Sequence, residues 1–535
     1  MSLIAITGLI ASGKSTAMNM LKIRRYGDQI GRVEFIDLDQ YSKNLRSQEW
    51  IKNKQRTFIS SHFPELDKNI DVLSPSFIIE NIFSDPILYK EYGEIFQQHF
   101  VDYLWQLKSQ QDTTFIIECS ALFSYPRLMD LMDGIINIVP NREIHLRNVR
   151  SRNIPQHHFE IFSNIYVQHY RWNTKLYEVQ LTIGTLMELR AGVEAGLIYQ
   201  LAQFSSNESY KQYYTSGYNI ISLMNCGFSA DEWNDNPYHN ENHTKSVITD
   251  LILSGYFTET LGYTALFHDY KYVPGESNNE QNAIRELIDW WKLSPRSDEV
   301  DLQEMCNIIM YTKYIHKLDK TSATFALSDL SHFLRTPEEI IETEQLLFRE
   351  YGKYNFEKYK QTHIKILKSL PTLHPDLECL HDGINIACAY INTYTPNIAW
   401  FCGSFNPFTI GHLDILEKAQ KMFDKVIVVQ GFNPNKPIPD NCEYLQETLG
   451  VEVICRCESI PNLIDSVGYT PTLIRGIRNY QDVTDATDWI NQINEFVNNK
   501  ANLCMIPGDP QYNHISSSFV RAITNMGKDT SKFVI

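Results

Sequence analysis

The sequence lacks the features of secreted, membrane-spanning and disulfide-stabilised proteins. Its ten cysteines are scattered over 535 residues without a CxxC pair, so we expect reduced thiols, no disulfide bond and no zinc site made of cysteines. No apolar run reaches the roughly 20 residues of a membrane span, and the opening residues MSLIAITGLIASGKS have no basic flank of a secretory signal. We therefore expect a cytoplasmic protein without a membrane partner.

Basic residues are also scarce relative to acidic ones. The chain has 48 Lys and Arg against 64 Asp and Glu, a formal net charge of −16. This balance disfavours binding to nucleic acid, because the phosphate backbone is bound by clustered cations. Hydrophobic residues make up 43% of the chain, enough to fill several cores, so extended disorder is excluded. At roughly 150 residues per domain, the length predicts about three or four domains.

Charge and residue pattern both change near residues 190 and 396. Residues 1–190 hold equal numbers of basic and acidic residues, whereas acidic residues are in excess over residues 191–396 and, less strongly, over residues 397–535. Short β-rich runs alternate with helix-like stretches in the first and third segments, which is typical of parallel sheets with crossover helices. Apolar residues of the middle segment recur at helical spacing. The sequence therefore predicts a multidomain protein in which an all-helical domain separates two α/β domains.

A phosphate-binding loop is the clearest motif of the first segment. Residues 8–15 read GLIASGKS, which fits GxxxxGKS, and lie between an apolar run and a helix-like stretch, as the motif requires. Backbone amides of such a loop face phosphate oxygens, its lysine reaches the transferred phosphate, and its serine holds magnesium. A glycine turn that only joins a strand to a helix is the less favoured alternative. The residues predicted to bind ATP and Mg²⁺ are Gly8, Gly13, Lys14, Ser15 and Thr16.

Two aspartates and an arginine-rich segment accompany this loop. Asp37 and Asp39 end the next strand-like run, at the rim where α/β sheets bind ligands, and one of them is expected to orient an acceptor hydroxyl. Three arginines are suited to close over the triphosphate, although a solvated basic helix face explains each of them equally well. These arginines are Arg147, Arg150 and Arg152.

The first segment resembles dephospho-coenzyme A kinases over most of residues 1–180. The resemblance rests on GLIASGKST, FIDLD, NIFSDP, FQQHF, IIECSALF and the arginine segment, in this order and spacing. It implies a P-loop kinase domain that transfers the ATP γ-phosphate to the ribose 3′-hydroxyl of dephospho-coenzyme A. By the same resemblance, Lys14 and Asp37 are catalytic and Arg147 lies at the ATP site.

Histidines and aspartates of the middle segment predict a metal site. The two histidines of YHNENH are four positions apart and share one helix face, and an HD pair and a distant aspartate follow. Imidazoles and carboxylates together suit a divalent transition metal with positions open for water. A bound metal lowers the pKa of its water and so provides a hydroxide that can hydrolyse a phosphate ester. The candidate residues are His239, His243, His268, Asp269 and Asp329.

The combination of YHNxxH, FHD, NNE and a distant aspartate resembles HD-domain metal-dependent phosphohydrolases over about residues 205–395. The resemblance implies that His239 is a proton donor and that Glu280 assists from behind the ligands. A metal that only stabilises the fold, without turnover of a substrate, is the alternative. The implied ligands of Mn, Fe, Co or Zn are His243, His268, Asp269 and Asp329.

Phosphate-binding residue types recur in the third segment. Residues 406–412 read NPFTIGH before a helix-like run, where Gly411 lets the backbone approach a phosphate and His412 donates to its oxygens. A histidine that only caps the helix is the alternative. Several companion residues are of the donor types that stabilise the charge of a pentavalent phosphate. The candidates are Ser404, Phe405, His412, Lys436, Arg475, Arg478, Ser516, Ser517 and Ser518.

The third segment closely resembles phosphopantetheine adenylyltransferases over nearly all of residues 398–535. The motifs are GSFNPFTIGHLDILEKA, FDKVIVVQGFNPNKP, IRGIR and IPGDPQYNHISSSFVR. The resemblance implies a Rossmann-like nucleotidyltransferase domain in which the serine run binds ATP. It further implies that Ser404 and Lys436 contact the phosphate of 4′-phosphopantetheine, Arg475 the pantetheine side, and His412 and Arg478 the ATP phosphates. Of these residues, His412, Lys436 and Arg478 would be catalytic.

The two outer resemblances concern consecutive reactions, which predicts a multifunctional coenzyme A biosynthesis enzyme. ATP and 4′-phosphopantetheine would give dephospho-coenzyme A, which would then be phosphorylated, and the middle segment would add a phosphohydrolase of unknown substrate. The rival interpretation is an active phosphohydrolase regulated or scaffolded by nucleotide-binding outer domains. A narrower alternative is that the outer domains act on other nucleotides, such as a nicotinamide nucleotide. A homo-oligomer is compatible with the sequence.

Overall fold

The chain divides into two compact units. The first unit comprises Met1–Asp235, His239–Glu342 and Ser369–Ile384, and the second comprises Asn236–Tyr238, Thr343–Lys368 and Asn385–Ile535. No helix among the residues described below is long and apolar enough to cross a membrane. The computed structural model of the protein describes residues 2–28, 31–66, 71–110, 113–170, 175–205, 207–227, 236–293, 300–314, 316–351, 356–431, 442–457, 459–467, 470–498 and 500–534.

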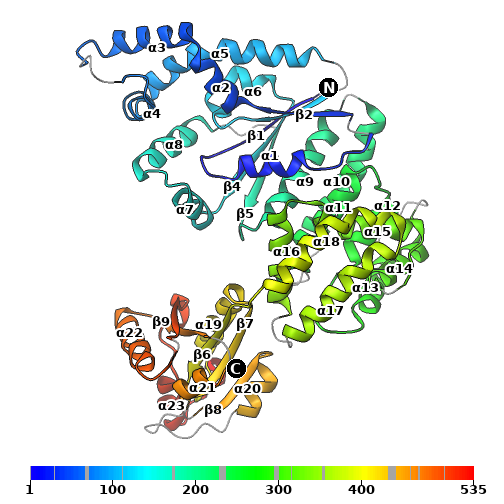
Figure 1. Ribbon diagram of the computed structural model, residues 1–535, viewed down its shortest axis with the longest axis vertical. Helices are drawn as coiled ribbons and strands as arrows, with labels where there is room; N and C mark the ends of the chain where they lie inside the picture. Colours follow the sequence, from blue (N-terminus) through cyan, green and yellow to red (C-terminus); the bar gives the residue numbers. More distant parts are fainter. Residues whose placement is uncertain are drawn as a thin grey trace. The chain divides into compact units, whose positions relative to one another are not determined.

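The first unit contains a five-stranded sheet in which every described strand pair is parallel (Figure 1). The strand order is β2-β3-β1-β4-β5, so β1 is central and β3 separates it from β2. This architecture confirms the expected α/β class, because parallel neighbours require the crossover helices that the sequence alternation predicted. The strands are β1 (Ser2–Gly8), β2 (Arg32–Asp37), β3 (Thr113–Glu118), β4 (Gly134–Pro140) and β5 (Leu176–Leu181).

Alternating residues of the central strand pack on opposite faces of this sheet. Ile4 and Ile6 belong to one hydrophobic core, and Leu3 and Ala5 belong to another, as the period of two in a strand requires. Both faces are therefore covered by helices. The helices that precede β5 in the chain are α1 (Lys14–Lys22), α2 (Leu38–Ser47), α3 (Glu49–His62), α4 (Pro75–Ile78), the π-helix η2 (Ile79–Phe83), α5 (Pro86–Lys108), the 3₁₀-helix η3 (Leu122–Ser124), α6 (Pro126–Leu131), α7 (Arg142–Ser151) and α8 (Gln156–His169).

The described part of residues 186–393 contains helices and their connections, and no strand occurs among those described residues. The expected boundary at residue 190 falls inside α9, and the division of the chain into three domains stays a prediction. The helices are α9 (Leu186–Phe204), α10 (Glu208–Gly227), α11 (Glu241–Leu253), α12 (Glu259–Phe267), α13 (Asn279–Leu293), α14 (Leu302–Tyr311), α15 (Lys320–Asp329), η5 (Ser331–Leu334), α16 (Pro337–Glu350), α17 (Phe356–Ser369), η6 (Leu370–Thr372), η7 (Pro375–Leu380) and α18 (His381–Thr393).

Helix α9 joins the sheet of the first unit to the helices that follow it. Leu197 and Ile198 of α9 lie in the same hydrophobic core as Ile4 and Ile6 of β1, and this core extends to residues of α11 such as Leu251. The sheet and the helical bundle therefore share apolar packing instead of having separate cores. This continuity explains why the first unit contains both.

Buried ion pairs reinforce the same helix. Arg190 of α9 is 1% exposed and pairs with Glu194 (2.9 Å) and Glu339 (2.5 Å). Arg24, which follows α1, pairs with Glu194 (3.5 Å) and with Asp250 of α11 (2.5 Å). Burial alone would raise the pKa of Glu194, but Arg24 and Arg190 hold it below its usual value. The carboxylate is therefore charged, and its stability depends on these arginines.

The second unit contains another five-stranded sheet of parallel pairs, in the order β10-β9-β6-β7-β8. Central β6 again sends alternate residues to two cores, Ala399 and Phe401 to one and Trp400 and Cys402 to the other. The strands are β6 (Ile398–Gly403), β7 (Lys425–Gly431), β8 (Glu452–Cys457), β9 (Thr472–Ile477) and β10 (Asn502–Pro507); the helices are α19 (Ile410–Met422), α20 (Cys442–Thr448), α21 (Ile460–Ser466), α22 (Tyr480–Asn494), η8 (Pro510–Tyr512), α23 (Ser517–Asn525) and η9 (Ser531–Phe533).

The expectation that the chain has no disulfide bond is wrong for one cysteine. Cys455 of β8 is disulfide-bonded. Sequence spacing does not show which cysteine side chains a strand brings within bonding distance, because pairing depends on Cβ positions in space. Six cysteines among the described residues are free, and they are Cys119, Cys306, Cys379, Cys388, Cys402 and Cys504.

Replacing Arg190 by methionine is expected to destabilise the protein by about 3–5 kcal/mol, because buried Glu339 loses its ion pair and buried Glu194 keeps only Arg24. Arg32→Met is the matched control, since Arg32 is 74% exposed in its 2.6 Å pair with Glu34, and it should cost less than about 1 kcal/mol. Urea unfolding followed by circular dichroism measures both. Equal effects of the two substitutions would contradict the role assigned to the buried pairs.

Candidate functional sites

A pocket of about 570 Å³ opens in the second unit at the carboxyl ends of β6 and β9. Every candidate residue that the sequence assigned to this part lines it, with one exception. Lys436 lies outside the described residues. The candidates that the pocket brings together are Ser404, Phe405, His412, Arg475, Arg478, Ser516, Ser517 and Ser518.

His412 is held in one tautomer at the start of α19. The backbone N–H of Thr409 donates to Nδ1 of His412 (3.0 Å), and the amide of His412 donates to the Thr409 hydroxyl (3.4 Å), which forms a capping box. Because Nδ1 accepts a hydrogen bond, the neutral imidazole carries its proton on Nε2. His412 therefore does cap α19, the alternative role considered above. The same cap orients its Nε2–H group, which can donate a hydrogen bond to a phosphate oxygen.

Two arginines of the pocket are oriented by neighbours on α22. The guanidinium of Arg475 lies 4.1 Å from the ring centroid of Trp489 and donates to the Cys402 carbonyl oxygen (3.3 Å). Arg478 makes a two-point contact with Asp482, Nε to Oδ2 at 3.1 Å and Nη2 to Oδ1 at 3.2 Å. Burial would raise the pKa of Asp482, but Arg478 lowers it below its usual value. Both cations are therefore positioned before any ligand binds.

Sequence reasoning missed the α22 residues of this pocket. The lining residues Asp482, Asp485, Ala486 and Trp489 recur at spacings of three, four and seven, which place them on one face of the helix. That spacing was the available signal. It could not show which face points toward the pocket, because helical periodicity defines a stripe and not its partner.

The serine run forms the start of helix α23, and two of its hydroxyl groups are used in hydrogen bonds within the protein. Ser516 caps α23 by accepting from the amide of Phe519 (3.1 Å), and the hydroxyl of Ser517 donates to the Pro407 carbonyl oxygen (2.9 Å). Amides of the first helical turn have no partner within the helix, and they carry the positive end of its dipole. The pocket is therefore lined by a helix start, a feature that can attract anions, as well as by arginines.

The P-loop of the first unit connects β1 to α1 with its lysine folded inward. Lys14 Nζ donates to the carbonyl oxygens of Gly8 (3.1 Å) and Leu9 (2.8 Å). Gly8 has φ of 147°, and a Cβ there would lie 2.6 Å from the carbonyl oxygen of Ile138, so only glycine fits. Burial lowers the pKa of Lys14 to about 8, although Asp39 and Glu118 act in the opposite direction.

An acidic residue missed by sequence reasoning completes this site. Glu118 ends β3 and accepts a hydrogen bond from the Ser15 hydroxyl at 2.7 Å. Burial raises the pKa of Glu118 above its usual value. The sequence IIECS does place Glu118 at the end of a strand. That this strand lies beside β1, and so brings Glu118 to the P-loop, is known only from the strand order. A serine hydroxyl next to a carboxylate fits the ligand types that hold Mg²⁺ at nucleotide phosphates.

Asp37 and Asp39 have different surroundings. Asp37 is exposed and caps α2 by accepting from the amide of Gln40 (2.7 Å). Asp39 accepts from the hydroxyl of Ser120 (2.5 Å), just beyond β3, and contributes to the electrostatic environment of Lys14. Asp39 is thus the aspartate tied to the strand end beside the P-loop.

Helix α7 contacts the P-loop through residues other than the predicted arginine. His145 Nε2 lies 2.7 Å from the carbonyl oxygen of Ile10, and the Asn148 side-chain amide donates to the Ala11 carbonyl oxygen (3.2 Å). Arg147 points elsewhere and donates to the Gly184 carbonyl oxygen (3.3 Å). Arg152, at the end of α7, lowers the pKa of Lys14, so a positive charge from this segment does act at the loop.

Thr16, the last of the predicted P-loop residues, is half-buried in α1.

The histidines and aspartates of the helical region converge in the first unit. His243 Nε2 lies 3.1 Å from an oxygen of Asp329, 3.2 Å from an oxygen of Asp269 and 3.3 Å from His268 Nε2. His268 Nε2 lies 3.0 Å from the same Asp269 oxygen. His243 lies in the first turn of α11, whereas His268 and Asp269 directly follow α12 and Asp329 ends α15. The structure thus brings together all four candidate ligands.

This donor set fits a divalent cation. His268 Nδ1 lies 2.8 Å from the Ala265 carbonyl oxygen, which fixes the proton on Nδ1 and turns the lone pair of Nε2 toward the cluster. Burial would raise the pKa of Asp269, but His268 holds it well below its usual value. Two charged carboxylates and two imidazole nitrogens face one another, and imidazole with carboxylate is the ligand combination of Mn, Fe, Co and Zn.

Supporting residues surround this cluster. The ring of His239 stacks on Tyr272 with centroids 4.0 Å apart, and it also contacts the ring of His243. The hydroxyl of Tyr314 donates to the second oxygen of Asp329 (2.5 Å), a contact that sequence reasoning did not assign to this tyrosine. Glu280 pairs with Lys313 at 2.9 Å. His239 is therefore next to the proposed ligands, and Asp329 is oriented from behind.

Comparison with known proteins gives matches for the carboxyl-terminal region. Residues 400–523 match the cytidylyltransferase-like family. The phosphopantetheine adenylyltransferase of Streptococcus pneumoniae (strain ATCC BAA-255 / R6) is 34% identical over 146 residues, 26% of this chain and 89% of that protein. The enzyme of the same name from Oenococcus oeni (strain ATCC BAA-331 / PSU-1) is 33% identical over 147 residues, 25% of this chain and 90% of that protein. The one from Limosilactobacillus reuteri (strain DSM 20016) is 29% identical over 145 residues, 26% and 83% respectively.

Two solved structures also match part of the chain. TT1252 from Thermus thermophilus is 20% identical, covers 37% of this chain and 97% of its own, and has a TM-score of 0.29. An unliganded sugar kinase from Janibacter sp. HTCC2649 is 14% identical, covers 37% of this chain and 94% of its own, and has a TM-score of 0.22. Scores this low establish no fold for this chain.

The affinity of the P-loop for ATP is expected to fall as the pH rises above about 8, by up to about tenfold per pH unit. Below pH 8 the Lys14 side chain is already charged. Above it, a bound phosphate favours the ammonium form, so binding must take up a proton. Calorimetric titration with a non-hydrolysable ATP analogue at pH 7 and 9, in buffers of different ionisation enthalpy, measures this uptake. Lys14→Ala supplies the background from any other ATP site; equal uptake by that variant would contradict the prediction.

Proposed function

Because the chain belongs, through its carboxyl-terminal region, to the phosphopantetheine adenylyltransferase family, we propose that this region joins ATP to 4′-phosphopantetheine, giving dephospho-coenzyme A and pyrophosphate. The observation that carries the proposal is the convergence of His412, Arg475, Arg478 and the start of α23 on one pocket. These donors to anionic oxygen come from three separate chain segments: the start of α19, the end of β9 and the start of α23. A site of this kind suits two phosphorylated substrates.

The reaction needs little covalent help from the protein. An oxygen of the phosphopantetheine phosphate attacks the α-phosphorus of ATP and pyrophosphate leaves, so negative charge develops on the oxygens around that phosphorus. His412 Nε2–H and the Arg478 guanidinium would stabilise this charge, with Asp482 and Thr409 holding the two donors in place. Arg475, stacked on Trp489, would contact the pantetheine side of the acceptor. Mg²⁺, when bound, would neutralise part of the triphosphate charge.

We propose a second activity for the P-loop, phosphorylation of the dephospho-coenzyme A that the first reaction forms. Its support is the inward-folded Lys14 and the hydrogen bond between Ser15 and Glu118, a hydroxyl and carboxylate that would hold Mg²⁺. Asp39 stands at the same strand end and is placed to orient the ribose 3′-hydroxyl, with exposed Asp37 as the other candidate. The product of one unit would thus be the substrate of the other.

A metal-dependent phosphohydrolase is the third proposed activity. Its support is the convergence of His243, His268, Asp269 and Asp329. These residues would hold a divalent transition metal, which would supply an activated water for attack on a phosphate ester. His239, stacked against Tyr272, would donate a proton to the leaving group. The chain's own contribution is to orient the ligands and to keep the site largely buried.

The rival proposal is that the nucleotide-binding regions only regulate or scaffold this hydrolase. Intact donor geometry favours active outer regions, because a degraded site has no reason to retain the Arg478–Asp482 and Ser15–Glu118 hydrogen bonds. Another acceptor nucleotide, such as a nicotinamide nucleotide, is the narrower alternative. The curated relatives named phosphopantetheine adenylyltransferase favour the pantetheine substrate.

We expect the full chain with ATP, Mg²⁺ and 4′-phosphopantetheine to form coenzyme A, measured by chromatography of products. Lys14→Ala should stop the sequence at dephospho-coenzyme A, because the γ-phosphate loses its cation. His412→Ala should slow adenylyl transfer by about 10²–10³-fold yet leave phosphorylation of added dephospho-coenzyme A unchanged. His514→Ala is the control, since this histidine is exposed and does not line the pocket. No product from the wild-type chain would favour the rival proposal.

For the metal site, Asp269→Asn combined with Asp329→Asn is expected to remove one equivalent of Mn²⁺ or Co²⁺ per chain, measured by elemental analysis after dialysis. The physical reason is the loss of both anionic ligands. Hydrolysis of bis(p-nitrophenyl) phosphate should disappear with the metal. Asp289→Asn is the matched control, because this exposed aspartate pairs only with Lys292 in the part of the chain with coordinates. A variant that loses hydrolysis but keeps its metal would contradict the ligand assignment.

A further inference from the structure

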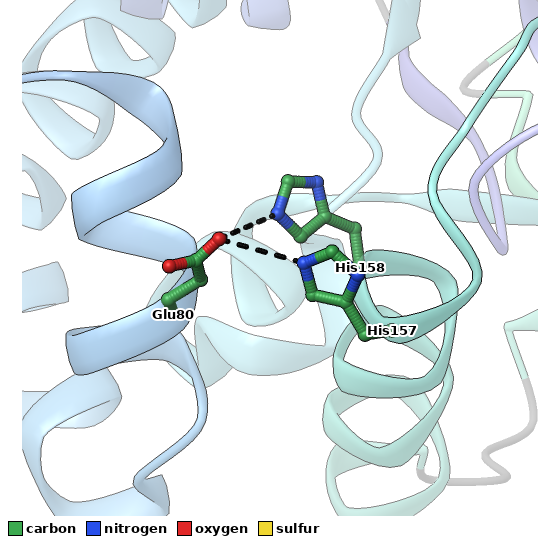
Figure 2. Close-up of side chains that lie close together, drawn as sticks. All are labelled: Glu80, His157 and His158. Atoms are coloured by element: carbon green, nitrogen blue, oxygen red, sulfur yellow. Dashed lines mark hydrogen bonds and ion pairs between the residues drawn. The ribbon is translucent and has the colours of Figure 1, made fainter.

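Three side chains of the first unit, outside the sites described above, lie close to one another. Glu80 lies on the π-helix η2, and His157 and His158 lie in the first turn of α8, 77 residues away in the chain. Figure 2 shows both imidazole rings turned toward one carboxylate. One ligand atom from each side chain lies within 4.8 Å of the others. These residues have no part in the P-loop, the adenylyltransferase pocket or the histidine–aspartate cluster.

The spacing of the three atoms suits a tetrahedral cation. Glu80 Oε1 lies 3.4 Å from His157 Nε2 and 3.5 Å from His158 Nε2. Two ligands bound tetrahedrally to zinc at about 2.1 Å are themselves about 3.4 Å apart. Both observed separations exceed the ~2.9 Å of an ordinary N–H···O hydrogen bond. The atoms are therefore spaced for an ion between them more than for direct contact.

The second histidine has an unmet bonding requirement. His158 Nε2 is buried and has no hydrogen-bond partner among the residues that the structure describes. Adjacent residues of a helix normally point in different directions, yet the imidazoles of His157 and His158 both face Glu80. A buried nitrogen without a hydrogen bond costs about 1–3 kcal/mol. A cation held between the two imidazoles and the carboxylate would remove this cost.

Access and ligand chemistry narrow the class of ion. The side chains of His157 and Glu80 are 59% and 51% exposed, whereas that of His158 is 14% exposed, so an ion can enter from solvent and retain water. Two imidazoles with a single carboxylate favour Zn²⁺, Co²⁺, Ni²⁺ or Cu²⁺ over Mg²⁺ and Ca²⁺, which prefer oxygen ligands. The single carboxylate also offsets the positive dipole at the start of α8.

We propose that Glu80, His157 and His158 form a second site for a divalent transition cation of the zinc class, with water as its fourth ligand. The ion would tie η2 to α8 and so join two segments that already pack together. Helix α8 follows the P-loop-contacting helix α7 after only four residues. A cation here would therefore restrain the segment that leads out of α7.

The test is Zn²⁺ binding by the full chain, counted by equilibrium dialysis and located by anomalous diffraction at the zinc edge. The wild-type chain is expected to bind one more equivalent than His157→Ala combined with His158→Ala, and the anomalous density should lie beside Glu80. Zn²⁺ should also raise the melting temperature of the wild-type chain more than that of the double variant, because the ion binds only the folded state.

Two further variants keep the result interpretable. Glu80→Gln preserves the side-chain shape and both imidazoles, and it should weaken this site by at least the ~10-fold that loss of a supporting ligand contact costs. His62→Ala is the matched control, because His62 pairs with Glu91 at 3.1 Å as a lone imidazole, and it should change neither the count nor the affinity. Equal Zn²⁺ equivalents in the wild-type chain and the double variant, or no anomalous density beside Glu80, would overturn the proposal.

Discussion

Both candidate phosphate sites depend on the short connection between a buried parallel strand and the helix that follows it. In each sheet the central strand ends in a turn that places a helix start beneath the carboxyl edge, β1 before α1 and β6 before α19. Neighbouring parallel strands end at the same edge, so β3 adds Glu118 to the first site and β9 adds Arg475 to the second. Strand order therefore decides which side chains meet at each candidate site, and each helix terminus adds its backbone amides.

The histidine–aspartate cluster depends on a different constraint, burial of charge among helices. Hydrogen bonds from neighbouring residues fix its carboxylates and imidazoles. The Tyr314 hydroxyl donates to Asp329, and the Ala265 carbonyl oxygen accepts from Nδ1 of His268. A comparable arrangement surrounds Arg190, where buried carboxylates depend on fixed arginines. In both places the low-polarity surroundings make charge compensation mandatory, which orients the groups strongly.

Sequence reasoning predicted what depends on local pattern and missed what depends on neighbours. Strand and helix alternation predicted both parallel sheets, and spacing of histidines and aspartates predicted a cluster that the structure does bring together. Glu118 was missed because its importance arises from the position of β3 between β1 and β2. Trp489 and Asp482 were missed because a helical stripe does not reveal its facing surface. The meeting of Glu80 with His157, 77 residues apart in the chain, is likewise a product of tertiary proximity.

The core that α9 shares with β1 and α11 has a consequence for how this chain can be divided. A boundary drawn at residue 190 would cut through the helix and leave apolar side chains of the sheet facing water on one piece and those of the bundle on the other. Neither fragment would have a complete interior. Recombination or engineering that exchanges the P-loop region would therefore have to transfer α9 and its packing partners with it. These elements would be inherited together.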